Sequence, residues 1–266
     1  MSSFYTNIQL AGDTILYRGY ENGEAVQYRT SFSPTLYVLS KKKEKFKTLD
    51  GRDVSPVKFH NAREAREFIK QYEHVDNFEV HGYERFVYQF IRQEYPDDVD
   101  YHIDQMKIYA LDIEVQCENG FPDVEAAAEE MLSITIKDMV TKKYYSWTTR
   151  EFDAPDNLEL NVSWTEQEML TNFITWWAEN TPDILTGWNV NLYDVPYIAR
   201  RVNRILGEKW MKSLSPWNRA NEREVYVQGR RNYAYDISGI NILDYLDLYR
   251  KFTYSSQESY RLDHIA

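Results

Sequence analysis

The sequence predicts an α/β protein with two domains: a small mixed N-terminal domain, and a second domain in which helices flank a mixed sheet. Three observations lead to this prediction. Period-two alternation between turn residues dominates about the first hundred residues, whereas apolar strand patterns followed by two amphipathic helices come after it. Between them, residues 94–104 are acidic, contain Pro96 and offer little core material. We therefore expect domains at residues 1–104 and 105–266.

The N-terminal domain begins with strand patterns. Residues 4–10 alternate between apolar and polar side chains, and Asn22-Gly23 is the strongest short signal for a hairpin turn. Residues 35–39 form another strand pattern. Apolar side chains at helical spacing then predict a helix that starts near Asn61.

The second domain starts with a different pattern. Residues 108–115 are almost continuously apolar, which predicts a strand that is buried on both faces. Two more strands are expected at 132–136 and 144–147. A capping box at Thr165–Glu168 opens one amphipathic helix, and a second helix is expected from about Val195 to Leu206.

Composition excludes several classes of protein. The 266 residues include 22 Tyr and 7 Trp, and 43% are hydrophobic, which argues against disorder. A single cysteine, Cys117, excludes a disulfide framework and a thiolate zinc site and fits a reducing compartment. No apolar run approaches the roughly 20 residues that span a bilayer, and the start lacks a signal-peptide pattern. We expect a soluble cytoplasmic protein.

Charge is distributed unevenly around a net value of -11. Residues 112–130 carry seven acids and no base, whereas residues 200–231 carry nine Lys or Arg against three Glu. An acidic pocket beside a basic strip would suit a metal-dependent enzyme that acts on a polyanion. Solvated faces of two ordinary elements explain the same distribution equally well.

Two carboxylates interrupt the apolar strand pattern. Asp112 and Glu114 are two residues apart and therefore point to the same face of a sheet, with Ile113 turned toward the core. Such acids can hold hard cations such as Mg²⁺; the alternative is that Arg or Lys pairs with them. The same triplet in Asp123-Val124-Glu125 lies in a polar loop and is expected to face solvent.

A second group of polar side chains lies where a short strand leads through a loop into a helix, at residues 186–197. Asp194 would sit at the N-terminus of that helix, where an ordinary N-cap is the alternative explanation. Asn189 and Tyr193 accompany it in a loop in front of the same sheet.

These two segments resemble a known family. Residues 109–114 (YALDIE) resemble the first exonuclease motif of family B DNA polymerases, and residues 189–194 resemble the second. The segments at 184–190 and 242–252 are similar to the replicative polymerases of T-even phages. The resemblance is loose in the N-terminal domain and close over residues 105–266.

The resemblance implies a 3′–5′ proofreading exonuclease with an RNase H-like fold, in which four acids hold two Mg²⁺ ions, with Mn²⁺ as a substitute. Carried over by motif, Asp112 bridges both metals, Glu114 helps to hold the ion on the nucleophile side, and Asp194 contributes on the leaving-group side. These three residues are the expected catalytic and metal-binding residues. The implied partners are primer–template DNA with a single-stranded 3′ end and the remaining polymerase domains or a complementary polypeptide, in the cytoplasm of an infected bacterium.

Substrate contacts are also implied. Ile113, Asn189 and Tyr193 match motif positions near the substrate strand. Phe121 resembles a loop aromatic that stacks on the frayed terminal bases, with a core or loop-packing role as an equal alternative. Residues 223–237 read as a hairpin with Gly229–Asn232 at its tip.

That hairpin resembles one that helps to hold the two DNA strands apart. Its tip residues Arg230 and Arg231 could contact phosphate, or they could simply keep an exposed hairpin soluble.

The third exonuclease motif, Tyr-x-x-x-Asp, is not found. Tyr260-Arg261-Leu262-Asp263 is one residue too short, so we do not assign Asp263 a catalytic role. We expect a truncated or naturally split polymerase whose isolated chain has weak or no nuclease activity. The alternative is a nucleic-acid-binding module without catalysis, in which Lys41–Lys47, Phe46 and Phe59 bind RNA or single-stranded DNA.

Overall fold

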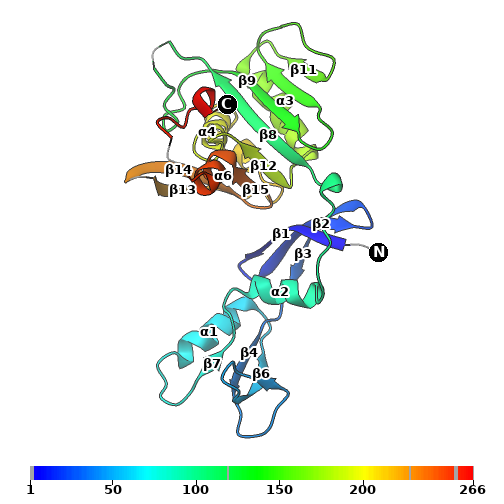
Figure 1. Ribbon diagram of the computed structural model, residues 1–266, viewed down its shortest axis with the longest axis vertical. Coiled ribbons are helices and arrows are strands. Elements are labelled where there is room, and N and C mark those ends of the chain that lie inside the picture. The colour runs from blue at the N-terminus through cyan, green and yellow to red at the C-terminus, as the bar shows by residue number, and fades with distance from the viewer. Residues whose placement is uncertain (1–2, 119, 228, 255–256, 266) are drawn as a thin grey trace. The chain divides into compact units, whose positions relative to one another are not determined.

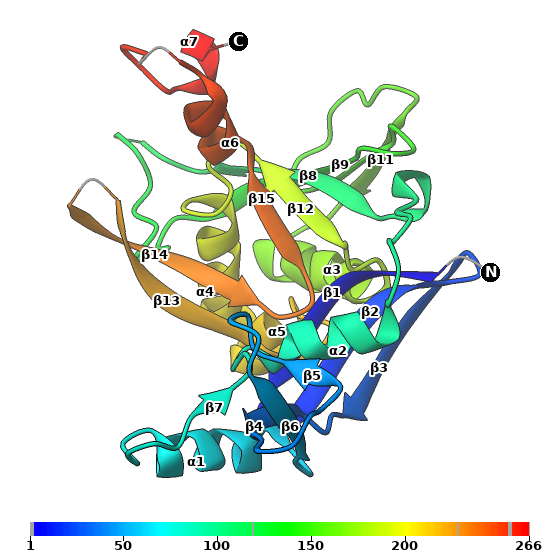
Figure 2. The ribbon, with the colours of Figure 1, turned by 60° about the horizontal axis from the view of Figure 1, so that its bottom comes forward.

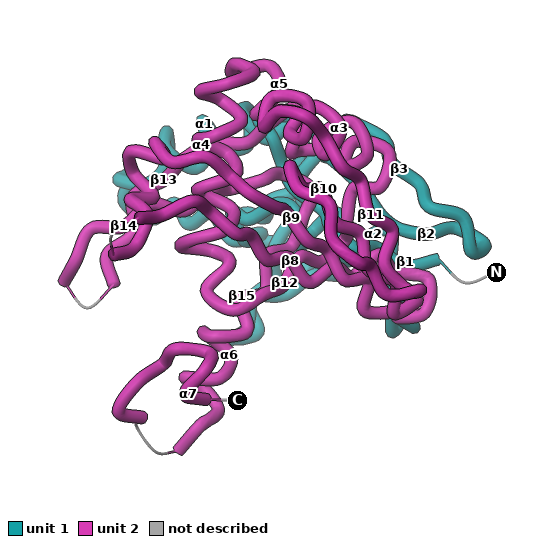
Figure 3. The backbone as a smooth tube through the Cα atoms, turned by 90° about the horizontal axis from the view of Figure 1, so that it is seen from above, with its two compact units in different colours: residues 1–101 teal, residues 102–266 magenta. Residues whose placement is uncertain are grey.

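The computed structural model describes residues 3–118, 120–227, 229–254 and 257–265. The chain forms two compact units, residues 1–101 and 102–266 (Figure 1), which Figure 3 colours separately. Each unit has its own cluster of buried hydrophobic side chains. No helix in the described ranges is long and apolar enough to cross a bilayer.

Unit 1 contains two antiparallel sheets and two helices. The first sheet has the order β1-β2-β3 and the second the order β5-β6-β4-β7. The elements are β1 (Ser3–Ala11), β2 (Thr14–Glu21), β3 (Glu24–Ser31), β4 (Thr35–Leu39), β5 (Phe46–Lys47), β6 (Asp53–Lys58), α1 (Ala62–Tyr72), β7 (Val80–His81) and α2 (Phe86–Glu94).

The structure confirms the predictions in unit 1 that rested on strong local sequence signals. Asn22 and Gly23 both have positive φ, 55° and 86°, as the predicted hairpin turn requires. The side chain of Asn61 caps α1 by accepting the N–H of Glu64. Helix α2 was not predicted because it has no side-chain cap at Arg85 and no acid in its first turn.

Unit 2 is built on a six-stranded mixed sheet with the order β11-β10-β9-β8-β12-β15. Strands β8, β12 and β15 are parallel and lie side by side (Figure 2), while β9 is antiparallel to both of its neighbours. The strands of this sheet are β8 (Ile108–Val115), β9 (Met131–Asp138), β10 (Tyr144–Thr148), β11 (Leu158–Val162), β12 (Ile184–Gly187) and β15 (Asn241–Asp244).

The other elements of unit 2 are helices and one separate hairpin. They are the 3₁₀ helix Ile103–Gln105, α3 (Glu166–Glu179), α4 (Asp194–Leu206), α5 (Glu208–Lys212), β13 (Ala220–Val227), β14 (Arg230–Ile237), α6 (Tyr245–Phe252) and α7 (Leu262–Ile265). Strands β11 and β15 were not predicted, because both are short and β11 mixes polar and apolar residues.

Both predicted helices of unit 2 are present. Thr165 caps α3 by accepting the N–H of Glu168, and the Glu168 carboxylate accepts the N–H of Trp164 in return. Helix α4 ends at Leu206, and the next residue, Gly207, has a φ of 93° and donates its N–H to the last turn. The two helices contact each other, and α3 covers β9 and β10.

Strand β8 departs from the prediction in its burial. Tyr109, Leu111 and Ile113 are buried, but Asp112 and Glu114 on the opposite face are exposed. The expectation that β8 is buried on both faces was therefore wrong. An apolar run can belong to a strand with one open face, and here that face borders a cavity.

Candidate active site

The three predicted acids border one cavity of about 780 Å³ in unit 2. Asp112 and Glu114 come from β8, and Asp194 is the first residue of α4. The loop after β8, the turn between β12 and α4, helix α6 and residues 260–263 complete the walls. Elements that are far apart in the sequence thus meet where β8 and β12 end.

Asp112 and Glu114 both project from the open face of β8, as predicted from their spacing. Neither carboxylate has an ion-pair partner within the described part of the chain, which argues against the alternative that they pair with Arg or Lys. Although it touches solvent, Asp112 lies in a recess, and this desolvation raises the pKa of its carboxyl.

Asp194 is almost completely buried, with 3% of its surface exposed. Its Oδ1 accepts the backbone N–H of Ile113 at 3.1 Å, so the side chain of α4 reaches across to β8. The N-cap is Tyr193, which makes no side-chain cap, and the N-cap alternative for Asp194 was therefore wrong. Burial, followed by the negative charge of Asp112, raises the pKa of Asp194 to about 7.

Asp244 is a residue of this region to which the sequence analysis gave no role. Its carboxylate accepts the N–H groups of Asn189 at 3.0 Å, Asn191 at 2.9 Å and Leu246 at 2.9 Å. It therefore caps α6 and also holds the turn between β12 and α4, where Asn189 has a φ of 62°. The signal that could have revealed it is an acid between the apolar pair Ile242-Leu243 and a helical pattern.

Phe121 stands at the cavity with 77% of its surface exposed. Its ring meets Tyr193 edge-on, with the centroids 5.6 Å apart. The alternative of a core-packing role was wrong, because an exposed ring with one aromatic neighbour contributes little to a core. Asn119, which belongs to the same predicted loop, lies outside the described residues.

Of the remaining motif residues, Asn189 and Tyr193 border the cavity with their side chains, whereas Ile113 does not. Asn189 and Tyr193 border the cavity with their side chains partly exposed, and burial together with the nearby Asp194 raises the pKa of Tyr193 to about 12. The side chain of Ile113 packs in the core instead. Only the backbone of Ile113 serves the site, through its N–H on Asp194.

The hairpin arginines lie elsewhere. Arg230 and Arg231 are the first residues of β14 rather than the turn, and neither is among the described residues that line the cavity. Arg231 approaches Glu125 at 3.9 Å and Glu224 at 3.7 Å. Gln228, which precedes Gly229 in the sequence, lies outside the described residues.

Part of the basic strip expected over residues 200–231 is neutralised within the fold. Arg200 is bonded to Glu222 and Arg201 to Glu166, and both also donate to backbone carbonyls, as Arg204 does. Positive charge that is neutralised in this way cannot attract phosphate strongly. These three arginines of α4 therefore do not contribute to an open basic strip, whereas Lys209, Arg219 and Arg230 of the same segment are exposed.

Residues 260–263 reach the cavity even though their motif is one residue short. The indole N–H of Trp188 donates to the Tyr260 carbonyl at 3.0 Å, and Arg250 lies over the Tyr260 ring at 4.7 Å. Asp263 borders the cavity and lies 3.8 Å from Arg261. A further carboxylate therefore stands at the rim of the cavity.

The donor set suits a hard divalent cation, because every candidate ligand is a carboxylate oxygen. Asp112 and Asp194 are close enough for the charge of one to raise the pKa of the other. Within the described ranges, however, no three Asp, Glu, His or Cys side chains gather closely enough to hold one ion. The chemistry of the ligands fits, but they do not form a closed set.

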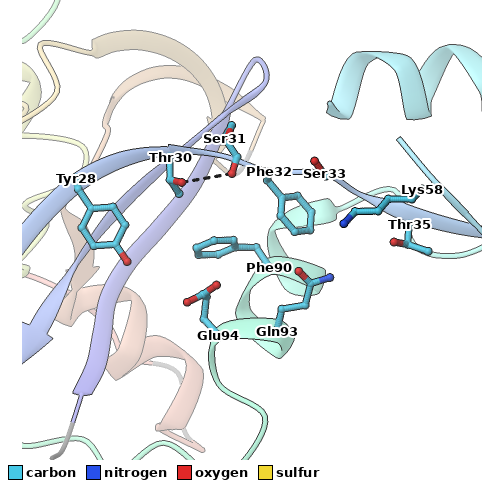
Figure 4. A pocket seen from close by; sticks show the side chains of 10 residues that line it. All are labelled: Tyr28, Thr30, Ser31, Phe32, Ser33, Thr35, Lys58, Phe90, Gln93 and Glu94. Carbon is cyan, nitrogen blue, oxygen red and sulfur yellow. Dashed lines mark hydrogen bonds between the residues drawn. The ribbon is translucent and has the colours of Figure 1, made fainter. Parts of the chain in front are cut away.

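Unit 1 offers a contrasting cavity of about 370 Å³, shown in Figure 4. Tyr28 and the hydroxyl residues of β3 face Phe90 and Glu94 of α2, with Lys58 at the side. This cavity has a single carboxylate in its lining and therefore does not match the pattern of a multi-acid metal site.

The lysine-rich segment of unit 1 also differs from expectation. Phe46 is 40% exposed, but Phe59 is 7% exposed and belongs to the core of this unit, so Phe59 cannot stack on a base.

Comparison with known proteins agrees with this architecture. A family model described as DNA polymerase family B, exonuclease domain, matches residues 67–265. The chain is 30% identical to the DNA-directed DNA polymerase of Enterobacteria phage T4 and 27% identical to that of Escherichia phage RB69. Both alignments cover 100% of this chain and 32% and 33% of the relatives. The DNA polymerase catalytic subunit of human herpesvirus 6B is 26% identical over 36% of this chain and 10% of its own length.

The chain thus spans about a third of the length of the two phage relatives that it matches. Its mixed sheet with flanking helices agrees with an exonuclease domain of RNase H-like type, as the resemblance implied. The match to the family model covers most of the chain and includes all three candidate acids. The chain therefore belongs to the family of the DNA polymerase family B exonuclease domain.

Proposed function

We propose that residues 105–266 form a 3′–5′ proofreading exonuclease domain, which removes mispaired nucleotides from a single-stranded 3′ end, and that residues 1–104 form the N-terminal domain of the same polymerase. The observation that carries this proposal is the group of three carboxylates around one cavity, none of them neutralised by a cationic side chain of the described chain. A buried acid without a compensating charge, such as Asp194, destabilises the fold and is typical of a functional site.

Asp112, Glu114 and Asp194 would hold two Mg²⁺ ions, for which Mn²⁺ could substitute. When bound, these ions would activate the attacking water and stabilise the leaving 3′ oxygen. Because burial raises the pKa of Asp194 to about 7, its carboxyl is only partly ionised near neutral pH, and it must release its proton to act as a ligand. Affinity for the metal should therefore increase as the pH rises through this range.

The other residues would position the substrate. The N–H of Ile113 keeps the Asp194 carboxylate directed toward β8. Phe121 is exposed and can stack on a terminal base, while Asn189 and Tyr193 border the path of the strand. Arg231 lies on the hairpin, where it could meet backbone phosphate at a distance from the cavity.

The chain would work as part of a larger polymerase. We propose that DNA is its substrate, and that the remaining polymerase domains or a complementary polypeptide complete it. Because the candidate ligands do not form a closed set, we expect the isolated chain to bind metal weakly and to digest DNA slowly or not at all.

Digestion of a 5′-labelled single-stranded oligonucleotide with Mg²⁺ or Mn²⁺ tests the proposal. A ladder of shortened products that disappears in Asp112→Ala but persists in Asp153→Ala, an exposed acid outside the cavity, would support it. If the isolated chain is inactive, activity should appear once it is extended through the next Tyr-x-x-x-Asp sequence. Inactivity of the extended chain as well would contradict the proposal.

A binding function in unit 1 is the second candidate. Lys41, Lys42, Lys43 and Lys45 are exposed beside Phe46, and such a cluster can bind RNA or single-stranded DNA. The test is salt-dependent binding of a labelled RNA by the full chain and by Lys41→Glu/Lys43→Glu. Loss of binding in the charge-reversed variant would favour this function, and unchanged binding would contradict it.

A further inference from the structure

One face of α4 holds the loop that carries Phe121. Tyr197, Arg200, Arg201 and Arg204 recur at helical spacing, and all four side chains donate to backbone carbonyls of residues 124–129. Tyr197 reaches Glu129, Arg200 reaches Val124, Arg201 reaches Ala128, and Arg204 reaches Ala126, over 2.8, 2.8, 2.8 and 3.3 Å. We call residues 121–130 the Phe121 loop and these four side chains the α4 clamp.

The Phe121 loop has little packing of its own. Ala127 is its single buried residue, at 1% exposure, and the partly exposed Val124 is its one other hydrophobic side chain that packs against the core. Its internal hydrogen bonds include those from the N–H groups of Glu125 and Ala127 to Asp123. A loop with so few apolar contacts depends on hydrogen bonds to its carbonyls for a defined position.

Two of the clamp residues have different surroundings. Arg201 is buried, and its guanidinium forms two 2.6 Å bonds to the buried Glu166, which anchors it to the start of α3. Arg200 instead extends toward the β13–β14 hairpin, where it bonds to Glu222 at 2.5 Å and lies 4.6 Å from the Tyr233 ring centre. Arg201 is thus held in place by α3, whereas Arg200 connects the Phe121 loop to the β13–β14 hairpin.

The hairpin and the Phe121 loop also meet directly. The Tyr233 hydroxyl is within 3.3 Å of Glu125, and the guanidinium groups of Arg200 and Arg231 both lie over its ring, the latter at 5.4 Å. Helix α4 packs along β14 (Figure 2), which brings these side chains together. Displacement of the hairpin would therefore move Arg200 and the carbonyl of Val124 that it holds.

We propose that Arg200 is a positioning residue that couples the β13–β14 hairpin to Phe121. By joining Val124 to Glu222 and Tyr233, it sets where Phe121 stands at the mouth of the cavity. The ring is then in place to stack on the terminal base when the hairpin contacts DNA. The role in base stacking rests on the proposed exonuclease function, but the connection from the hairpin through Arg200 to the Phe121 loop does not.

Two measurements on the full chain test the coupling. Hydrogen exchange of the amides of residues 123–129 reports the loop directly. Binding of a 5′-fluorescein oligonucleotide with a 3′-terminal 2-aminopurine, in Ca²⁺, reports stacking at the strand end. The variants are Arg200→Gln, Phe121→Ala and their double mutant. Arg223→Gln is the matched control, because it removes a hairpin arginine that pairs with Asp236 at 2.8 Å.

We expect Arg200→Gln to increase exchange of the loop amides by about 10-fold. We expect Arg200→Gln and Phe121→Ala each to weaken oligonucleotide binding about 5-fold. The double mutant should bind no more weakly than Phe121→Ala, because both changes remove the same stacking contact. Arg223→Gln should leave exchange and binding unchanged.

Each negative result of these experiments contradicts a different part of the proposal. Loop amides that exchange at the wild-type rate in Arg200→Gln overturn the coupling whatever the DNA does. Additive losses in the double mutant overturn the role of Arg200 in placing Phe121. Failure to bind the oligonucleotide, both by the wild-type chain and by the chain extended through the next Tyr-x-x-x-Asp sequence, refutes the proposed function, and the exchange data then still decide whether the loop is clamped.

Discussion

The substitution Asp194→Asn should stabilise unit 2 at alkaline pH. Asp194 is 3% exposed and has no cationic partner in the described chain. Its hydrogen bond from Ile113 can be kept, because an asparagine side-chain oxygen accepts the same N–H. The substitution removes a costly buried charge while it preserves the shape and the acceptor.

The size of the stability gain expected for Asp194→Asn follows from the pKa of Asp194. Raising it from 3.8 to about 7 corresponds to roughly 4 kcal/mol of preference for the protonated form in the folded state. Between these values the folded chain binds more protons than the unfolded chain, so the stability of the wild type falls as the pH rises. The penalty is complete above pH about 7 and absent below pH about 4. Because a neutral Asn removes both the desolvation cost and the repulsion from Asp112, we expect it to recover about 2–4 kcal/mol at pH about 8.

Urea unfolding followed by tryptophan fluorescence measures this effect. All seven tryptophans lie in unit 2, so the signal reports the unit that contains Asp194. Wild type and Asp194→Asn are compared at pH about 8 and about 5 in EDTA, with the exposed Asp153→Asn as a control that should change stability by less than about 0.5 kcal/mol. A gain of equal size at both pH values, or a loss at the higher one, would refute the reasoning.

Three further predictions concern the same unit. Arg201→Met should cost about 3–5 kcal/mol in urea unfolding because it leaves the buried Glu166 unpaired, and the double change with Glu166→Gln should recover much of this loss. Gly187→Ala should cost about 1–3 kcal/mol because its Cβ would lie 2.6 Å from a β8 carbonyl; unchanged stability would contradict the close approach. Asp112→Asn should lower the pKa of Asp194, so the pH at which the wild type loses stability should move downward; an unmoved pH profile would show that the two acids do not interact.

Much of the local structure could be predicted from the sequence. The caps at Asn61 and Thr165 and the hairpin turn at Asn22-Gly23 depend on residues a few positions apart, and the structure confirms all three. The face shared by Asp112 and Glu114 follows from strand geometry alone and is also confirmed. Helix α2 and strands β11 and β15 escaped prediction because their short patterns carry weak local signals.

The acids of the candidate site could be predicted from the sequence, but the residues that hold the surrounding loops in place could not. Two carboxylates in an apolar strand are anomalous in any sequence, which is why Asp112 and Glu114 were recognised. Asp244 was missed because an acid before a helix is a common cap, and its bonds to Asn189 and Asn191 span the fold. The hydrogen bonds from Arg200 and the other α4 arginines to the Phe121 loop could not be predicted either, because they also join residues that are far apart in the sequence.

The sequence by itself determined which side chains could bind a cation and which elements would carry them, because caps, turns and strand faces arise from neighbours along the chain. Only the tertiary structure decided which charges remain free. Folding neutralised Arg200 and Arg201 with Glu222 and Glu166, but it left Asp112 and Asp194 together without a cation in the described chain. Electrostatic energy depends on distance in space and on burial, and neither can be read from separation along the sequence.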